Sequence, residues 1–263
     1  MYKYPKTLNA SKNKIGIVLS GGGARGIAHL GVLQALEEFG ITPSIISGTS
    51  AGAILGAFYA KGFSIEEVLK IIKNVHFFNF SNFLIEKPGF FSMKGFEKIY
   101  DQYFPSNSFS DLDIPLIVSA TDILKGEIVY FSSGNLSKSL MASSCIPMVF
   151  QPVNYNGTYY VDGGILDNFP IEPLLNQCEI IIGIHVNSIK KEVNEIQLNK
   201  ILDRSFHLAL NNSVKTKIEK CNLFIEPPDM SQFGIFDLER AKEIFDYGYN
   251  YGLSIESEVK KLI

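Results

Sequence analysis

The first forty residues combine an apolar run, a glycine cluster and a segment with helical spacing. Residues 15–20 (IGIVLS) form a continuous apolar run of the kind that a buried strand shows. Glycine-rich residues 21–26 follow, and apolar side chains then recur every third residue from Ile27 to Leu36, ahead of Gly40. This spacing indicates a helix, and glycine is a common C-cap. The pattern predicts a strand, a glycine loop and a helix.

The same order of elements occurs a second time. Residues 43–47 predict a short strand, residues 48–52 (GTSAG) a tight turn, and the small residues 53–60 a helix that ends before Gly62. Two strand–loop–helix units in succession favour a parallel sheet that is covered on both faces, because parallel strands need crossover connections.

The rest of the chain continues to alternate between segments with helical spacing and segments typical of strands. A capping box of Ser64 and Glu67 predicts a helix as far as about Val75. Ser92 is expected to cap another helix, and the buried stripe of this helix comprises Phe96, Ile99, Tyr100 and Tyr103. Further strands are expected at 115–120, at 127–131, on both sides of the hairpin dipeptide 156–157, at 179–186 and at 223–225, with a short helix at 138–143.

No linker or repeat interrupts these elements. We therefore expect a single α/β domain over residues 1–263, with its core at about 14–255 and a mostly parallel central sheet sandwiched by helices.

Composition narrows the classes of function. Only 19% of the 263 residues are charged and the net charge is −3, which argues against disorder and against binding to nucleic-acid phosphates. The three cysteines are far apart, so neither a disulfide framework nor a metal site is indicated. The run at 15–20 is too short for a signal peptide or a transmembrane segment. We expect a cytoplasmic protein.

Residues 21–26 match the pattern G-x-G-x-x-G between a strand and a helix, which suggests a dinucleotide site. That fingerprint also requires an acidic residue about 20 residues further on, to bind the ribose. The chain has Ile45 to Ser50 (IISGTS) there instead, so the dinucleotide interpretation is disfavoured.

Residues 48–52 match G-x-S-x-G, again between an expected strand and an expected helix, which is the context of a nucleophile elbow. Small residues at both flanks let the backbone turn sharply, so that the Ser50 hydroxyl projects beside the amides that open the helix. Those amides stabilise negative charge. A serine hydroxyl becomes a good nucleophile only when a base removes its proton.

Two side chains are candidates for that base. His185 ends a buried run and follows Ser50 and Asp162 in the order Ser, Asp, His of α/β-hydrolases. Asp162 itself follows a strand, and Gly163 and Gly164 leave room for a group to approach its carboxylate. The residues alone leave both candidates open. Capping or surface positions are expected for the other histidines, which are His29, His76 and His207.

Three motifs, GGGARG at 21–26, GTSAG at 48–52 and DGG at 162–164, resemble in this order the bacterial branch of the patatin-like phospholipases. The segments 111–121, 142–150 and 161–170 are also similar to that family, and the resemblance covers about residues 14–255. It implies a patatin-like fold. Two departures are Cys145, where relatives often have alanine, and His185, where they often have aspartate.

The resemblance implies a Ser–Asp dyad without histidine, in which Ser50 is the nucleophile and Asp162 is the base. Backbone amides of Gly22, Gly23 and Ala24 would form the oxyanion hole. The motif residues that would support this arrangement are Gly21, Arg25, Gly26, Gly48, Gly52, Gly163 and Gly164. Arg25 is expected to hold the loop through hydrogen bonds to neighbouring carbonyls, and contact with a substrate phosphate is the alternative.

The implied activity is hydrolysis of lipid acyl esters through an acyl-enzyme, with phospholipids, lysophospholipids or neutral esters as substrates, in solution or at a membrane surface. Neither a metal nor a cofactor is needed for this chemistry. The alternatives are a Ser–His–Asp esterase that uses His185, and a lipid- or protein-binding member of the fold that has lost catalysis.

Phenylalanine is unusually frequent, with 20 residues. Phe96 and Phe104 fit the buried side of a helix and are expected in the core. Phe80, Phe83 and Phe90 lie in a segment near Pro88–Gly89 that could serve as a lid, so they are candidates for contact with the acyl chain as well as for the core.

Overall fold

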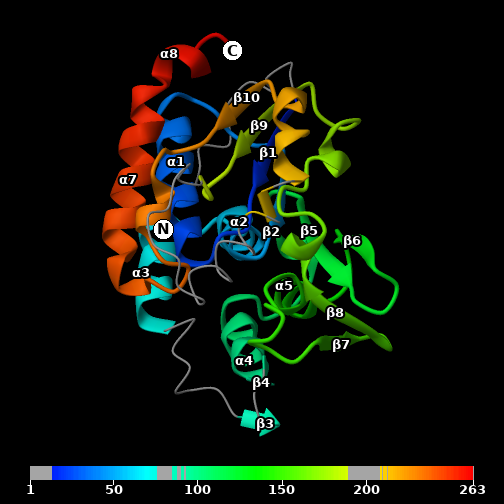
Figure 1. The fold of residues 1–263 in the computed structure, drawn as a ribbon. Coiled ribbons are helices and arrows are strands. Elements are labelled where there is room, and N and C mark those ends of the chain that lie inside the picture. Colours follow the sequence, from blue (N-terminus) through cyan, green and yellow to red (C-terminus); the bar gives the residue numbers. More distant parts are fainter. Residues whose placement is uncertain are drawn as a thin grey trace.

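A central sheet with helices and helical turns on both sides organises the chain (Figure 1). The computed structural model describes residues 14–75, 85–87, 90–91, 93–188, 208, 210–211 and 213–262. In spatial order, the strands of this sheet are β10 (Leu223–Ile225), β9 (Ile180–Ile184), β1 (Ile15–Leu19), β2 (Ile45–Thr49), β5 (Leu116–Asp122), β8 (Thr158–Asp162) and β7 (Val153–Tyr155), and β6 (Glu127–Phe131) also pairs with β5.

The sheet has a parallel half and an antiparallel half. Strands β10, β9, β1, β2 and β5 run parallel, whereas β6, β8 and β7 are antiparallel to their neighbours. The mostly parallel α/β sheet expected from the sequence is therefore confirmed. A separate antiparallel pair joins β3 (Ile85–Lys87) and β4 (Phe90–Phe91).

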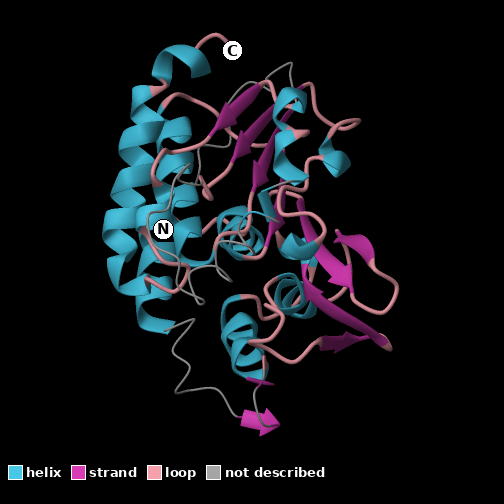
Figure 2. Ribbon diagram, viewed as in Figure 1, coloured by secondary structure: helices cyan, strands magenta, loops and turns pink. Residues whose placement is uncertain are grey.

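The longer helices, cyan in Figure 2, lie beside the strands of the sheet, and their order along the chain is the one that the sequence predicts. They are α1 (Ile27–Glu38), α2 (Ala51–Ala60), α3 (Ile65–Val75), α4 (Lys94–Tyr103), α5 (Leu136–Ser143) and α7 (Ala241–Ser254), and a short α8 (Glu256–Val259) follows. The Ser64–Glu67 capping box is present, because the Glu67 carboxylate accepts from the Ser64 amide and the Glu67 amide donates to Ser64 Oγ. Ser92, the expected cap of α4, lies outside the described residues.

Alternate residues of the strands supply two hydrophobic cores. On one face of β1, Ile17 and Leu19 pack with α1, α2, α3 and α7 in the larger core. On the other face, Val18 packs in a smaller core with Phe169 and Leu174. The sheet is buried on both faces, which explains the continuous apolar run of its parallel strands.

Much of the phenylalanine excess belongs to these cores. Phe96 and Phe104 are buried, as expected from the stripe on α4, and six further buried rings are Phe58, Phe109, Phe150, Phe169, Phe233 and Phe245. Phe58 of α2 contacts the rings of Phe63, Tyr103 and Phe104 at centroid distances of 5.0–5.5 Å. It joins α2 to the end of α4.

We expect Phe58→Ala to lower the free energy of unfolding by about 3 to 5 kcal/mol, because the truncation leaves a cavity among three aromatic rings. Urea denaturation followed by circular dichroism measures the loss. The matched control is Phe236→Ala, at a ring that is 41% exposed, and it should cost less than about 1 kcal/mol. Equal losses in the two variants would contradict this assignment of Phe58.

Candidate active site

Ser50 lies at a sharp turn between β2 and α2. Its backbone has φ 52° and ψ −120°, a region that non-glycine residues rarely adopt, and its side chain is 8% exposed. The flanking glycines are required by close contacts, since a Cβ on Gly48 would lie 2.7 Å from Ala53 N, and one on Gly52 would lie 2.4 Å from Leu19 O. The turn therefore has the geometry of a nucleophile elbow.

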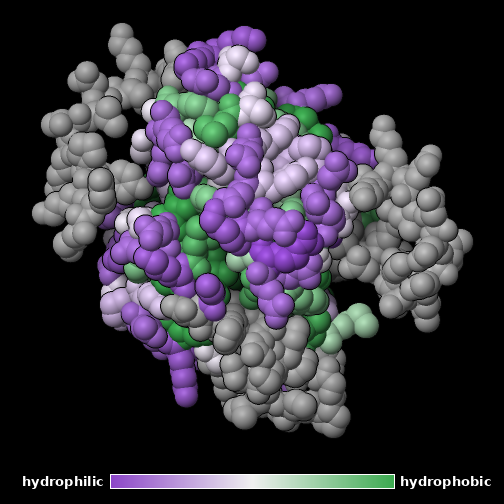
Figure 3. All heavy atoms as spheres, turned by 90° about the vertical axis from the view of Figure 1, so that its left-hand side faces the viewer, coloured by the Kyte–Doolittle hydropathy of each residue, from purple (hydrophilic) through white to green (hydrophobic). Residues whose placement is uncertain are grey.

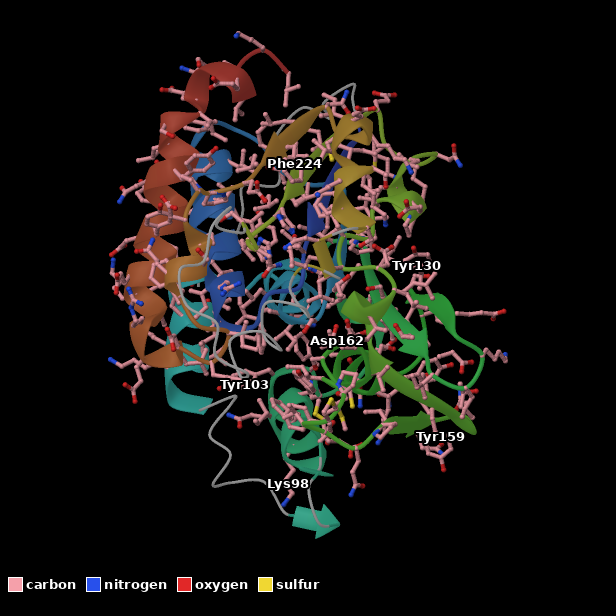
Figure 4. The ribbon with its side chains drawn as sticks, in the orientation of Figure 1. Lys98, Tyr103, Tyr130, Tyr159, Asp162 and Phe224 are labelled. Carbon is pink, nitrogen blue, oxygen red and sulfur yellow. The ribbon has the colours of Figure 1, made fainter. Side chains whose placement is uncertain are left out.

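Asp162 lies at the end of β8, near the centre of the molecule (Figure 4), and is 7% exposed. The Ser50 hydroxyl lies close enough to its carboxylate to lower the pKa of that group, and the Gly164 amide donates a hydrogen bond to Asp162 Oδ1 at 2.8 Å. Burial raises the pKa of Asp162 from 3.8 to about 6, and these two contacts limit the increase. At neutral pH the group is a carboxylate with more basicity than an exposed aspartate.

The register of β5 explains why these two residues meet. Thr49, the last residue of β2, pairs with Ser119, and Asp162 pairs with the next residue, Ala120. Strand β6 pairs with both Ser119 and Ala120, so it occupies the other edge of β5. Strands β2 and β8 therefore share one edge and end against each other, which brings the residue after Thr49 to Asp162.

The C-terminal end of α5 holds both backbones. The Ser50 amide donates to Ser143 Oγ at 2.8 Å, and the Asp162 amide donates to Cys145 O at 2.8 Å. The Cys145 side chain is buried and donates to the carbonyl of Gln151 at 3.0 Å. Two residues of one segment thus fix the relative position of Ser50 and Asp162.

The glycine loop lies beside this pair, and its amides are not equivalent. The amide of Gly21 donates to Asn168 O at 3.2 Å, and that of Ala24 donates to Ile235 O at 2.8 Å. Within the part of the chain that the structure describes, the amides of Gly22 and Gly23 donate to no protein acceptor. The expectation that the Ala24 amide serves as an oxyanion donor therefore needs correction, because that proton already has an acceptor.

Two further contacts fix the loop. Gly23 has φ +57°, and a Cβ there would lie 2.3 Å from Ile235 O, so glycine is required by both conformation and space. Arg25 is buried, and its Nε donates to Phe233 O at 2.7 Å. This contact agrees with the structural role expected for Arg25, although the carbonyl that it binds lies 208 residues away in sequence.

A cavity that is partly open to solvent joins the pair to the loop, and the space in it, open solvent included, is about 410 Å³. Its lining comprises Gly21, Gly22, Gly23, Ser50, Asp162, Asn168 and Asn187, with Ile146, Leu210 and Ile235 on the apolar side. A larger hollow of about 960 Å³ lies where β2 and β5 begin, and none of its lining residues is charged. The smaller cavity is therefore the candidate site.

The sequence analysis did not identify Asn168 and Asn187. They are 2% and 1% exposed, and the Asn187 amide donates from Nδ2 to Gly21 O. The position of Asn187 has a signal in retrospect, since it follows β9, the parallel neighbour of β1, and residues after parallel strands gather at one edge of the sheet. The position of Asn168, six residues after Asp162, has no comparable signal.

A buried network supports the segment that carries Asn168. Thr49 Oγ1 donates to Asp167 O at 3.0 Å, and the Tyr130 hydroxyl donates to the Asp167 carboxylate at 2.7 Å (Tyr130 is labelled in Figure 4). Lys217 Nζ neutralises that carboxylate at 2.6 Å and also donates to Glu172 at 2.7 Å. A buried carboxylate with these partners is satisfied and holds the segment in place.

His185 is not arranged as the base of Ser50. Its Nδ1 lies 2.6 Å from Glu226 Oε1, and its ring contacts Phe169 and Phe224. Its buried Nε2 has no hydrogen-bond partner among the described residues, so it does not accept the Ser50 proton. The geometry thus disfavours the Ser–His–Asp alternative.

The other histidines add one correction. His29 was expected at a cap or on the surface, but it is fully buried and its Nε2 lies 2.9 Å from Ser20 O. Burial lowers the pKa of His29 to about 4, so the ring is neutral. His76 and His207 lie outside the described residues.

The candidate acyl-chain contacts from the sequence are Phe80, Phe83 and Phe90. Phe80 and Phe83 lie outside the described residues, and Phe90 belongs to β4, but its side chain is among those not described.

The described residues contain no group of three or more His, Cys, Asp or Glu side chains that could hold a metal ion. Over the same residues, no helix is long and apolar enough to cross a membrane.

Comparison with known proteins shows what the chain is similar to. The family model "Patatin-like phospholipase" matches residues 17–175. The chain is 26% identical over 275 residues to lysophospholipase NTE1 of Kluyveromyces lactis, a match that covers 92% of this chain and 19% of that protein. It is 33% identical over 191 residues to lysophospholipase NTE1 of Cryptococcus neoformans, covering 67% of this chain and 11% of that protein. The chain thus spans a fifth or less of the length of these relatives.

Among solved structures, VipD from Legionella pneumophila has the same fold. It superposes with a TM-score of 0.55 and 17% sequence identity, and the match covers 94% of this chain and 67% of that chain.

The buried carboxylate predicts a pH-dependent effect of Asp162→Asn on stability. In the folded protein, Asp162 loses its proton at about pH 6, whereas the unfolded chain loses it near 3.8. As pH rises from about 4 to about 7, the wild type therefore loses up to about 3 kcal/mol of stability that the asparagine variant keeps. Denaturation at a series of pH values measures the difference.

The control variant for this stability comparison is Asp113→Asn, which removes an exposed carboxylate. If the stability difference between wild type and Asp162→Asn were the same at both ends of this pH range, Asp162 would not be desolvated as the structure has it.

Proposed function

Because the chain belongs to the patatin-like phospholipase family, we propose that it hydrolyses lipid acyl esters with a Ser50–Asp162 dyad. The observation that carries the proposal is an elbow serine whose hydroxyl lies close enough to a buried carboxylate of raised pKa to affect that pKa, beside two amides that donate to no protein acceptor among the described residues. A nucleophile, a base and oxyanion donors are then within one cavity.

The proposed reaction has two halves. Asp162 accepts the proton of Ser50 as Oγ forms a bond to the ester carbonyl carbon, and the carbonyl oxygen becomes an oxyanion. The oxyanion collapses, the bond to the alcohol breaks, and Asp162 gives its proton to the leaving alkoxide, which leaves an acyl-enzyme. Asp162 then takes a proton from water, the hydroxide attacks the acyl carbon, and the fatty acid leaves as Ser50 regains its proton.

The amides of Gly22 and Gly23, with the N-terminus of α2, are the proposed donors to the oxyanion. Each well-placed donor contributes about 3 to 4 kcal/mol to the transition state. A carboxylate is a weaker base than an imidazole, so these donors matter more here than in a Ser–His–Asp site. Asn187 supports the donors by holding the carbonyl of Gly21.

The substrate class is proposed from the relatives. The fungal proteins that the chain matches are named lysophospholipases, and we propose lysophospholipids and phospholipids as substrates, reached at a membrane surface. Membership of the bacterial branch, a single domain over residues 1–263 and a cytoplasmic location remain proposals from the sequence.

We expect Ser50→Ala and Asp162→Asn each to reduce kcat on p-nitrophenyl esters by about 10³-fold or more, because the nucleophile or its base is lost. Circular dichroism confirms that the variants are folded, and a fluorophosphonate probe should label the wild type but not Ser50→Ala. His185→Ala and the surface control Asp113→Asn should retain activity. Near-normal activity of Asp162→Asn would disprove the dyad, and inactivation by His185→Ala would revive the triad. If the probe did not label the wild type, the result would favour a binding protein that has lost catalysis.

The pH profile is a separate prediction. Only ionised Asp162 can accept the serine proton, so kcat/KM should rise with pH, with a midpoint near the pKa of about 6. Below the midpoint, activity should fall by about tenfold per pH unit. Initial rates in buffers of constant ionic strength give the profile. A midpoint near the ordinary aspartate value of about 4 would contradict the role given to burial.

A further inference from the structure

A second, apolar cavity lies immediately behind the elbow. The space between its lining atoms is about 350 Å³, a volume that includes open solvent. Its lining comes from the glycine loop, α1, α2, α3 and the turn at Leu238–Arg240, and comprises Gly23, Ile27, Ala51, Ile54, Leu55, Ile72 and Leu238. Helix α3 belongs to the face on which a band of apolar surface is visible between polar side chains (Figure 3).

The apolar cavity is lined by the residue that follows the proposed nucleophile. Ala51 directly follows Ser50, and Gly23, whose amide is a proposed oxyanion donor, lines both this cavity and the polar one. A carbonyl group that reacts at Ser50 would therefore place its substituents beside Gly23, at the boundary between the two spaces.

The lining determines what the cavity can hold. It contains no polar or charged side chain, so a phosphate or a sugar would lose its hydrogen bonds there, and even water would find too few partners. Hydrocarbon is stabilised there, because it removes its own apolar surface and that of the lining from water.

We propose that this cavity binds the acyl chain of the substrate, and that Ile72 and Leu238 determine which chain lengths fit. The inference rests on the proposed hydrolase function. Ile72 is a buried residue of α3, and Leu238 is partly buried and reaches the cavity from a turn near the C-terminal helix. The two side chains come from segments far apart in the sequence, and the cavity can be narrowed from either one independently.

Two substitutions narrow the cavity, Ile72→Phe and Leu238→Phe. Their matched controls are Ile71→Phe, a neighbouring buried residue of α3 that does not line the cavity, and Leu253→Phe on the exposed side of α7. The measurement is kcat/KM for p-nitrophenyl butyrate, octanoate, laurate and palmitate. In both cavity variants, the palmitate-to-butyrate ratio should fall by about tenfold or more, and in the controls it should stay near that of the wild type. Equal losses at every chain length, or an equal shift in the controls, would overturn the proposal.

A binding assay separates this inference from the proposed function. In the Ser50→Ala background, a fluorescent long-chain fatty acid should bind, and Leu238→Phe should weaken its binding by about tenfold. If the wild type hydrolysed no ester but this binding were present and weakened, the hydrolase function would fall and the cavity assignment would stand. If Leu238→Phe left the binding unchanged, the cavity assignment would fall whatever the catalytic result.

Discussion

The site depends on the way one edge of β5 is shared by two strands. Strand β2 occupies the edge as far as Ser119, and β8 takes over at Ala120 from the opposite direction. The elbow and the carboxylate therefore meet because both strands end there. Side chains alternate along a strand, so a slip of β8 by one residue would turn Asp162 to the other face of the sheet. Pairing between backbones is what fixes the distance between Ser50 and Asp162.

Taken alone, this arrangement lowers the stability of the folded protein. Ser50 has a positive φ, and Asp162 is a carboxylate held largely away from water, which raises its pKa. The end of α5 offsets these costs, since Ser143 and Cys145 accept the two backbone amides. The contact to Asp162 uses the backbone carbonyl of Cys145, which any residue supplies. The side chain at that position can therefore vary without loss of the contact.

Features that depend on neighbouring residues could be predicted from the sequence, whereas features that depend on contacts between distant residues could not. Elements such as β1, α1 and the capping box of α3 follow from local periodicity and capping, and their prediction was confirmed. His29 was expected at a cap or on the surface, but it is completely buried. The acceptor of the Ala24 amide is 211 positions away, at Ile235, so no pattern in the loop could show that this proton is already bound.

The glycine loop also shows that the site extends beyond the segment that the family model matches. That match ends at residue 175, but three contacts to the loop and the apolar cavity come from a short segment after it. Phe233 O binds Arg25, Ile235 O binds the Ala24 amide, and Leu238 lines the cavity behind Ser50. A chain cut after residue 175 would keep Ser50 and Asp162, yet it would lose the acceptors that hold the loop and one wall of the apolar cavity. The proposed site is therefore built from residues within the segment that the family model matches and from residues beyond it.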